Sequence, residues 1–116
     1  MKKQIIRAGI VGARGYTGTE LLKLLLTHPY VDLKYYFYSP ERAFSIDEMG
    51  LYERSQSSLL PTGISLLELL DENFDIPSRL DVIFLATPNE VSLELVSKLV
   101  SRKIHLIDLS GVFRLN

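Results

Sequence analysis

The sequence contains no cysteine, and its positive and negative charges nearly cancel. Without a thiol, these 116 residues can form no disulfide, no thiolate metal site and no cysteine nucleophile. The formal net charge of −1 gives no general attraction to nucleic acid or to an anionic membrane. The two histidines, His28 and His105, lack the spacing of a metal-binding pair. We therefore expect no metal and no nucleic-acid or membrane partner.

Long apolar runs are also missing. No stretch reaches the roughly 18 uninterrupted apolar residues that a membrane span requires. Lys2 and Lys3 precede a short apolar run, as in a signal peptide, but Gln4 and Arg7 interrupt that run and glycines follow it. We therefore expect a cytoplasmic protein. Apolar residues make up 47% of the chain, which suits one small domain or part of a larger protein.

Short apolar segments alternate with amphipathic ones along the chain. Strands are predicted at residues 5–11, 31–38, 81–86 and 104–109, which are largely apolar and rich in β-branched or aromatic residues. A helix is predicted from Gly18 to His28, because Thr17 and Glu20 fit a capping box and Pro29 ends the helix. A second helix is predicted at 89–102. Residues 64–70 are predicted as either a short strand or a helical turn, with a strand running into a turn favoured, and 39–60 as either a short helix or a mobile loop.

Each predicted helix has an apolar face that it would bury against a sheet. The first would bury Leu21, Leu22, Leu24, Leu25 and Leu26, and the second Val91, Leu95, Val96, Leu99 and Val100. Two strand–helix–strand units indicate a parallel sheet with helices on both faces, since such crossovers are right-handed. The predicted fold class is therefore α/β, a Rossmann-like doubly wound parallel sheet with strand order 3-2-1-4-5.

Glycines recur at every third position around the end of the first predicted strand. Gly12, Gly15 and Gly18 lie in the loop GARGYTG, which joins that strand to the first helix. In a doubly wound sheet, a pyrophosphate meets exposed backbone N–H groups here, at the positive end of the helix. Gly9 lies inside the strand and is assigned to packing. A tight turn that binds nothing is the competing interpretation, but the strand before the loop and the helix after it favour dinucleotide binding.

The end of the second predicted strand bears on the choice of cofactor. NAD-dependent enzymes usually place Asp or Glu there to bind the ribose 2′-hydroxyl. Here Ser39 and Arg42 suit a 2′-phosphate, and Arg14 would approach it from the neighbouring loop. Alternatively, Arg42 is a solvated surface residue that binds nothing. Glu41 is an acidic residue in the same segment, so NAD remains an alternative cofactor. We favour NADP(H).

Small polar residues follow the last two predicted strands. Thr87 and Pro88 come after the strand at 81–86, across the switch point of the sheet, and would line the path of the cofactor. Asn89 either lines that path or caps the next helix. Ser110 and Gly111 come after the strand at 104–109 and either approach the nicotinamide or form a turn.

Three segments together resemble the N-terminal part of N-acetyl-γ-glutamyl-phosphate reductase. They are GARGYTGTELLKLLLTHP, DVIFLATPNEVS and IDLSGVFRLN, which match in the same order across nearly the whole chain. Members of that family carry a GASGYTG-like loop, an FLA segment that ends in Val-Ser and a DLS-x-x-FR motif. Aspartate-semialdehyde dehydrogenases share the fold, but their loop usually lacks the Tyr-Thr-Gly ending.

The resemblance carries the family's cofactor site onto particular residues. The dinucleotide loop falls on Gly12, Arg14, Gly15, Tyr16, Thr17 and Gly18, the 2′-phosphate end on Ser39 and Arg42, and the nicotinamide side on Thr87, Pro88, Ser110 and Gly111. Arg14 replaces a common small hydroxyl residue, and Asn89 stands where many members have histidine. The contacts at these two positions are left open.

The reaction that the resemblance implies is the NADPH-dependent reduction of an acyl phosphate to an aldehyde, in arginine biosynthesis. A cysteine thiolate attacks the acyl carbon and expels phosphate, and hydride then reduces the thioester with help from a histidine. In the family, that cysteine follows the FR motif beyond Asn116. Residues 1–116 are therefore expected to form an N-terminal NAD(P)-binding domain without the catalytic domain, and no catalytic residue is assigned.

Two interpretations stay open. The first is the cofactor-binding portion of a reductase that acts on a small-molecule substrate and is a homo-oligomer at full length. The second is a non-catalytic dinucleotide-binding or interaction module, or part of another semialdehyde dehydrogenase. On the first interpretation, apolar surface near the last strand stays uncovered, and we expect self-association or marginal stability.

Overall fold

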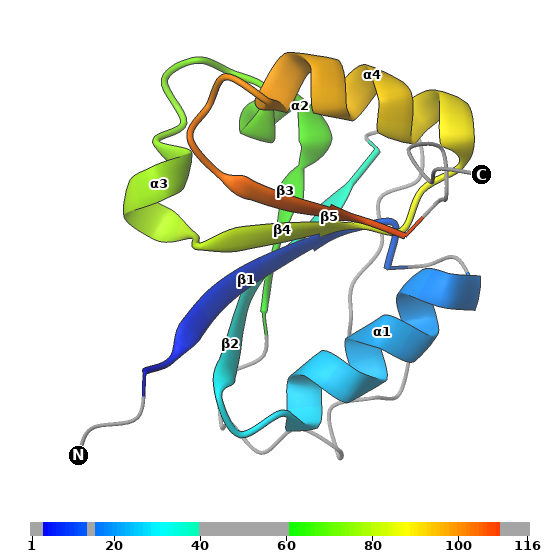
Figure 1. The fold of residues 1–116 in the computed structure, drawn as a ribbon, viewed down its shortest axis with the longest axis vertical. Coiled ribbons are helices and arrows are strands. Elements are labelled where there is room, and N and C mark those ends of the chain that lie inside the picture. The colour runs from blue at the N-terminus through cyan, green and yellow to red at the C-terminus, as the bar shows by residue number, and fades with distance from the viewer. Residues whose placement is uncertain (1–3, 14–15, 40–60, 110–116) are drawn as a thin grey trace.

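A five-stranded sheet forms the centre of the protein (Figure 1). The computed structural model describes residues 4–13, 16–39 and 61–109. The strands are β1 (Ile6–Val11), β2 (Val31–Tyr38), β3 (Thr62–Ser65), β4 (Val82–Leu85) and β5 (His105–Asp108). All neighbouring strands are parallel, and their order is β3-β2-β1-β4-β5. The predicted doubly wound sheet and its strand order are confirmed.

Helices cover both faces of the sheet. The helix α1 (Tyr16–Thr27) lies on one face, whereas α2 (Leu66–Leu69), α3 (Ile76–Arg79) and α4 (Asn89–Leu99) lie on the other (Figure 1). Strands covered on both faces bury both sets of side chains, which explains why the strand sequences are almost continuously apolar. Among the described residues, no helix has the length and apolarity needed to cross a bilayer.

Side chains of β1 alternate between the two helical layers. Ala8 and Ile10 pack with the α1 layer, and Val11 packs with the opposite layer. Gly9 also faces the opposite layer, where a Cβ atom would lie 2.8 Å from Cε2 of the buried Phe37. The packing role predicted for Gly9 is confirmed, because the missing side chain makes room for that ring.

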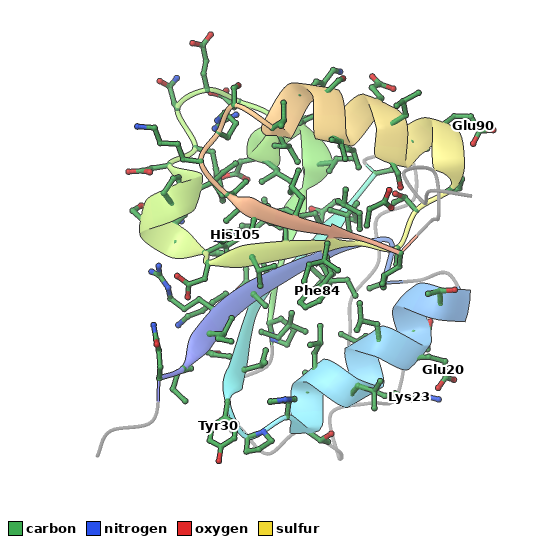
Figure 2. The ribbon with its side chains drawn as sticks, viewed as in Figure 1. Glu20, Lys23, Tyr30, Phe84, Glu90 and His105 are labelled. Atoms are coloured by element: carbon green, nitrogen blue, oxygen red, sulfur yellow. The ribbon has the colours of Figure 1, made fainter. Side chains whose placement is uncertain are left out.

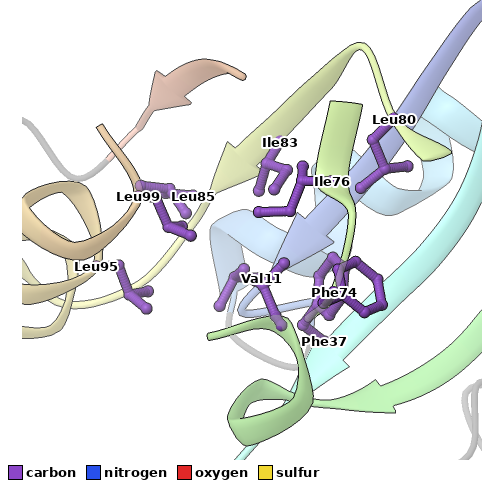
Figure 3. Close-up of a cluster of buried hydrophobic side chains, with 10 residues drawn as sticks. Val11, Phe37, Phe74, Ile76, Leu80, Ile83, Leu85, Leu95 and Leu99 are labelled. Atoms are coloured by element: carbon purple, nitrogen blue, oxygen red, sulfur yellow. The ribbon is translucent and has the colours of Figure 1, made fainter. Parts of the chain in front are cut away.

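The larger cluster of buried side chains lies between the sheet and the α2–α4 layer (Figure 3). Its members are Val11, Phe37, Leu69, Phe74, Ile76, Leu80, Ile83, Leu85, Leu95 and Leu99. Leu95 and Leu99 are the two residues through which α4 enters this cluster. Each fully buried Leu or Phe contributes about 1.5–3 kcal/mol to folding, so these contacts hold α4 over the ends of β4 and β5.

The apolar faces of the two long helices differ from the predicted ones. Leu24 in α1 is 68% exposed, and Val91 in α4 and Val100 directly after that helix are also exposed. Ser92 instead belongs to the buried side of α4, with none of its surface exposed. The prediction for these residues was wrong because counting apolar residues makes each stripe wider than the sheet beneath it can cover.

The beginning of α1 also differs from the prediction. The helix begins at Tyr16, not at Gly18, so Thr17 lies inside it and forms no capping box. The hydroxyl of Thr19 donates a 2.9 Å hydrogen bond to the carbonyl oxygen of Ala13. That bond ties the first turn of the helix to the loop. The sequence pattern had instead predicted that Thr17 would cap the start of the helix.

Two short helices lie in residues 61–81, the described part of the region between β2 and β4. The strand favoured for 64–70 ends at Ser65 and α2 follows it, so the helical turn considered as the alternative is present after the strand, whereas α3 was not predicted. The Ser65 hydroxyl accepts a hydrogen bond from the backbone N–H of Leu67 and caps α2. In α3, Asp75 accepts a bond from the N–H of Ser78 in the same way. The expectation for 40–60 lies outside the described residues.

Apolar surface is exposed at β5, the edge strand next to β4. Ile107 is 43% exposed, and Leu109, just after the strand, is 38% exposed. Phe84 of the neighbouring β4 points into the α1 layer and is only partly buried (Figure 2). The expected uncovered surface is therefore present, and self-association through it stays a prediction.

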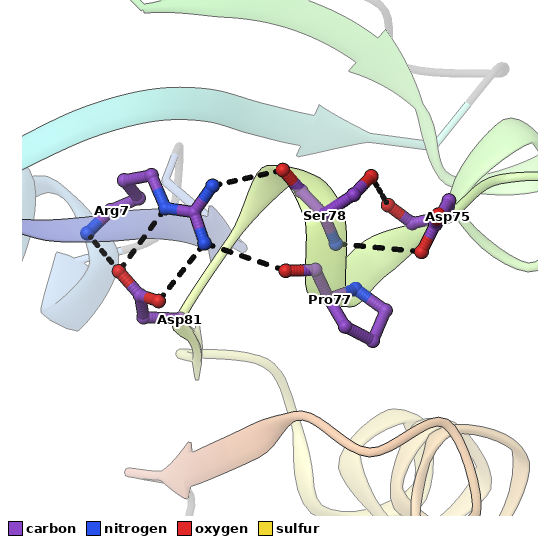
Figure 4. Close-up of polar contacts among 5 residues, drawn as sticks. All are labelled: Arg7, Asp75, Pro77, Ser78 and Asp81. Atoms are coloured by element: carbon purple, nitrogen blue, oxygen red, sulfur yellow. Dashed lines mark hydrogen bonds and ion pairs between the residues drawn. The ribbon is translucent and has the colours of Figure 1, made fainter.

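Arg7 links the amino end of β1 to α3 and to the residue before β4 (Figure 4). Its backbone N–H and its guanidinium donate to the carboxylate of Asp81, and the Nη2–Oδ1 distance is 3.0 Å. The guanidinium also donates to the carbonyl oxygens of Pro77 and Ser78 in α3. These hydrogen bonds from Arg7 hold the pKa of the Asp81 carboxyl below its ordinary value of 3.8.

Asp81→Asn is expected to lower the melting temperature at about pH 7 and to flatten its dependence on acid. A carboxyl whose folded pKa is depressed stabilises the fold above its unfolded pKa, and that stability is lost as the pH falls through the folded pKa. The melting temperatures of wild type and variant should therefore converge as the pH falls below 3.8. Thermal unfolding followed by circular dichroism across this range measures the effect.

Glu72→Gln is the matched control, because Glu72 is an exposed carboxylate in the turn after α2. It should follow the wild-type curve throughout. Parallel curves for wild type and Asp81→Asn would contradict a stabilising contact between Arg7 and Asp81.

Gly18 sets the distance between α1 and the end of β1. A Cβ atom on Gly18 would overlap the carbonyl oxygen of Gly12 and would come within 2.9 Å of the Cα of Ala13. Both contacts are to backbone, which cannot move aside as a flexible side chain can. The helix therefore rests directly on the loop that precedes it.

Gly18→Ala is expected to destabilise the protein by about 1–3 kcal/mol, the usual cost of overpacking. At an ordinary helical position the same change stabilises by about 1 kcal/mol, so the sign of the effect tests the contact. Urea denaturation measures it. Glu20→Ala, at an exposed position of the same helix, should change the free energy of unfolding by less than about 0.5 kcal/mol. A more stable Gly18→Ala variant would refute the close approach.

Candidate functional site

The carboxyl ends of β1 and β4 meet the first turns of α1 and α4 at one edge of the sheet. In Figure 1 these ends lie at the right, where the two helices begin on opposite faces. Glu90, in the first turn of α4, lies at this edge in Figure 2. β1 and β4 are neighbours, and the order of the sheet reverses between them. In open α/β sheets, ligands bind in the crevice at this switch point.

Gly12 occupies the sharp turn where β1 ends. Its φ of +89° lies in the left-handed region that favours glycine. A Cβ atom here would overlap the carbonyl oxygen of Ala86 and would lie 3.1 Å from Cγ2 of Thr87. The N–H of Ala86 donates a 2.9 Å bond to the carbonyl oxygen of Val11, which fixes the end of β4 beside the turn.

Gly12 and Gly18 thus bring three backbone segments together with no side chain between them. The loop contacts α1 through Gly18 and contacts the residues after β4 through Ala86. The first backbone N–H groups of a helix have no partner within the helix, and they carry its positive end. The first turn of α1 contains no acidic side chain that would repel an anion. In this bare-backbone cradle the positive end of α1 lies beside backbone alone, which suits an anion such as a phosphate group.

Thr87 and Ser92 form a hydroxyl pair on the β4 side of the cradle. Their Oγ1 and Oγ atoms are 2.6 Å apart, and the Ser92 hydroxyl also donates to the carbonyl oxygen of Thr87 at 3.3 Å. Thr87 is half-buried, and Pro88 after it is exposed. Asn89 is the first residue of α4, and Pro88 holds the N-cap position without a side-chain hydrogen bond. The N-cap role considered for Asn89 is therefore wrong.

The structure brings together some of the predicted site residues and leaves others outside its description. Gly12, Gly18 and Thr87 lie in contact around the end of β1, and Thr17 is exposed in the first turn of α1. Ser39 follows the carboxyl end of β2, the strand beside β1. Arg14, Gly15, Arg42, Ser110 and Gly111 lie outside the described residues, as does the side chain of Tyr16.

Two residues that contribute to this edge were missed in the sequence. Thr19 holds the loop through Ala13, and Ser92 pairs with Thr87. A polar residue inside an otherwise apolar helical stripe is the signal that would have drawn attention to Ser92.

Hydroxyl and backbone groups line the described part of this edge around Gly12, while the carboxylates of Glu90 and Asp108 lie at the start of α4 and the end of β5. The groups with shifted pKa values lie elsewhere. The guanidinium of Arg7 and the carboxyl of Asp81 pair at the amino end of β1, and a hydrogen bond from Lys98 lowers the pKa of Glu94 on the exposed surface of α4. No group of His, Cys, Asp and Glu suited to a metal ion occurs in the described ranges. The positive end of α1 and the bare backbone beside it suit the binding of an anionic ligand.

Residues 7–116 match the family model described as "Semialdehyde dehydrogenase, NAD binding domain". The chain is 37% identical over 111 residues to N-acetyl-gamma-glutamyl-phosphate reductase of Campylobacter jejuni, a match that spans 95% of this chain and 29% of that protein. It is 41% identical to the protein of the same name from Brevibacillus brevis, over 96% of this chain and 30% of that protein. The chain therefore spans about three tenths of these curated relatives, and the predicted resemblance is confirmed.

Solved structures with the same fold include aspartate semialdehyde dehydrogenases. That of Candida albicans with NADP matches with a TM-score of 0.64 and 18% identity, over 90% of this chain and 29% of that chain. The type II enzyme of Vibrio cholerae matches with a TM-score of 0.66 and 17% identity, over 96% of this chain and 32% of that chain. At such low identity these matches establish the fold alone. The match of the family model over residues 7–116 goes further: the chain belongs to the family of NAD-binding domains of semialdehyde dehydrogenases.

Proposed function

We propose that residues 1–116 form the NADP(H)-binding domain of an N-acetyl-γ-glutamyl-phosphate reductase. The observation that carries the proposal is the bare-backbone cradle, in which Gly18 rests on the carbonyl oxygen of Gly12 and Gly12 rests on that of Ala86. A side chain at either glycine would collide with a backbone carbonyl and move the first turn of α1 or the end of β1 away from its neighbour, so the backbone donors proposed to hold a phosphate group would lose their place. The name of the relatives at 37–41% identity supports the choice of substrate, N-acetylglutamyl phosphate.

The residues of the site divide along the length of the cofactor. Gly12, Arg14, Gly15, Tyr16, Thr17 and Gly18 would hold the pyrophosphate, Ser39 and Arg42 the 2′-phosphate, and Thr87, Pro88, Ser110 and Gly111 the nicotinamide half. The backbone N–H groups at the start of α1 serve the pyrophosphate because they are donors without helical partners. An arginine serves the 2′-phosphate because its planar fork of donors matches phosphate oxygens.

Bound NADPH supplies the hydride for the reduction. The residues of this chain bind the cofactor and orient it at the carboxyl edge of the sheet. Since the 116 residues include no cysteine, the thiolate that attacks the acyl phosphate belongs to the parent enzyme outside them. The parent enzyme is proposed to be cytoplasmic and homo-oligomeric, and the 116 residues alone are proposed to bind cofactor without reducing substrate.

Titration with NADPH tests the proposal directly. The change in nicotinamide fluorescence should saturate, and NADPH should bind about tenfold or more tightly than NADH, because the charge-assisted bonds to the 2′-phosphate are lost with NADH. With N-acetylglutamyl phosphate added, the absorbance of NADPH should stay constant. A chain that is folded by circular dichroism but shows no binding at millimolar NADPH would overturn the proposal.

Arg42→Ala is expected to weaken NADPH binding about tenfold while leaving NADH binding nearly unchanged, since only NADPH carries the 2′-phosphate. Arg79→Ala is the matched control: it also removes one guanidinium, from α3, which precedes the amino end of β4. The control should leave the affinity for both cofactors unchanged. Equal effects of Arg42→Ala on NADPH and NADH would show that Arg42 does not recognise the 2′-phosphate.

The competing interpretation is a stand-alone dinucleotide-binding module. Sequencing of the gene past codon 116 separates the two. A reading frame that continues into a segment with a cysteine supports the reductase, whereas a stop codon directly after Asn116 supports the module.

A further inference from the structure

The hydroxyl pair of Thr87 and Ser92 has a role beyond packing. We propose that Ser92 is a positioning residue: it fixes the side chain of Thr87 so that residue 87 offers the cofactor a methyl group and a hydrogen-bond acceptor, but no donor. The inference rests on the proposed function, because it concerns the same dinucleotide site. It adds that Thr87 contacts the nicotinamide half of the cofactor and takes no part in binding its phosphate groups.

The protons of the pair can be assigned by counting donors. The Ser92 hydroxyl carries one proton, which it donates to the carbonyl oxygen of Thr87 at 3.3 Å. Either hydroxyl could donate in the 2.6 Å contact between the two oxygens, and because the proton of Ser92 is taken, we assign Thr87 as its donor. The proton of Thr87 is therefore committed to Ser92, and its remaining capacity is that of an acceptor. Phosphate oxygens are acceptors too, so this hydroxyl has nothing to donate to them.

Ser92 is held firmly enough to act in this way. None of its surface is exposed, and it lies in the first turn of α4, where its N–H donates a 2.9 Å bond to the carbonyl oxygen of Pro88. Leu95 and Leu99 anchor the same helix in the core. A side chain in such a packed position keeps its rotamer, so its hydroxyl is a fixed partner for Thr87.

The methyl group of Thr87 faces the cradle as a consequence. Cγ2 of Thr87 is the side-chain atom nearest to the Cβ position of Gly12, at 3.1 Å. A β-branched side chain has few χ1 states, so tying its hydroxyl to Ser92 also sets the direction of its methyl group. Beside Gly12 on the β4 side, the side chain of residue 87 therefore presents a methyl group, next to the backbone carbonyl of Ala86. The phosphate groups are left to the backbone N–H groups on the α1 side.

Ser92→Ala tests the proposal through the contrast between two ligands. NADPH spans the whole site, whereas adenosine 2′,5′-bisphosphate lacks the nicotinamide half. The variant releases the proton and the rotamer of Thr87, so its Kd for NADPH should rise about five- to tenfold. Its Kd for adenosine 2′,5′-bisphosphate should change less than twofold. Isothermal calorimetry measures both, and circular dichroism measures folding in the same samples.

Ser97→Ala is the matched control, since Ser97 lies on the exposed side of α4 and donates to the carbonyl oxygen of Glu94. It should leave both dissociation constants unchanged. Thr87→Val keeps the branched shape of residue 87 but removes the hydroxyl that Ser92 holds. It should show the same selective loss, and the double variant should show no further loss because the two residues act as one unit. Thr87→Val also carries the test if Ser92→Ala does not fold.

The outcomes separate this inference from the proposed function. A wild-type chain that binds neither ligand overturns both. A wild-type chain that binds both ligands, with Ser92→Ala binding NADPH equally well, overturns only the positioning role. An equal loss for the two ligands also overturns it, because a general structural role would weaken the whole site. The selective loss of NADPH supports it.

Discussion

The close approach of three backbone segments around Gly12 is the constraint on which the rest of the structure depends. A side chain at Gly18 would push α1 away from the loop, and a side chain at Gly12 would push the end of β1 away from Ala86. Both contacts are to carbonyl oxygens, so neither can be relieved by a change of rotamer. The contacts around Gly12 therefore fix three features together. These are the position of α1 on the sheet, the turn after β1 and the separation of β1 from the β4–α4 connection. The backbone donors of α1 lie beside that connection for the same reason.

The two edges of the sheet are stabilised by different means. At the amino edge, the guanidinium of Arg7 joins β1 to α3 and to Asp81 through side-chain hydrogen bonds. At the carboxyl edge, glycine contacts and the buried hydroxyl of Ser92 hold the segments together. The ion pair of Arg7 and Asp81 thus lies at the edge opposite to the one where an anionic ligand would bind. That separation leaves the positive end of α1 without a competing carboxylate in its first turn.

Most of the fold could be predicted because its signals are local and agree with one another. Strand β2 has the predicted bounds, and the strand order follows from two crossovers of the same kind. The start of α1 was placed two residues too late, because the capping-box pattern of Thr17 and Glu20 was followed although both residues lie inside the helix. The short α3 had a local signal, Asp75 followed by a proline, that was not used. Leu24 and Val100 are exposed because the sheet does not extend beneath them. The spacing of apolar residues within a helix carries no information about how far the sheet extends.

In the candidate site, features of the backbone could be predicted from the sequence, whereas the orientation of side chains could not. A glycine pattern reveals where the backbone turns sharply or approaches other backbone, so Gly12 and Gly18 were apparent in the sequence. The direction of a hydroxyl depends on its partner, and the partner of Thr87 is visible only once α4 is placed against the end of β4. The two halves of a dinucleotide would meet these two kinds of surface separately. The phosphates would meet backbone donors that need no side chain to orient them, whereas the nicotinamide would meet a threonine whose orientation a second residue has to maintain. On the proposed function, binding of the nicotinamide half is therefore the part that would depend on the packing of α4.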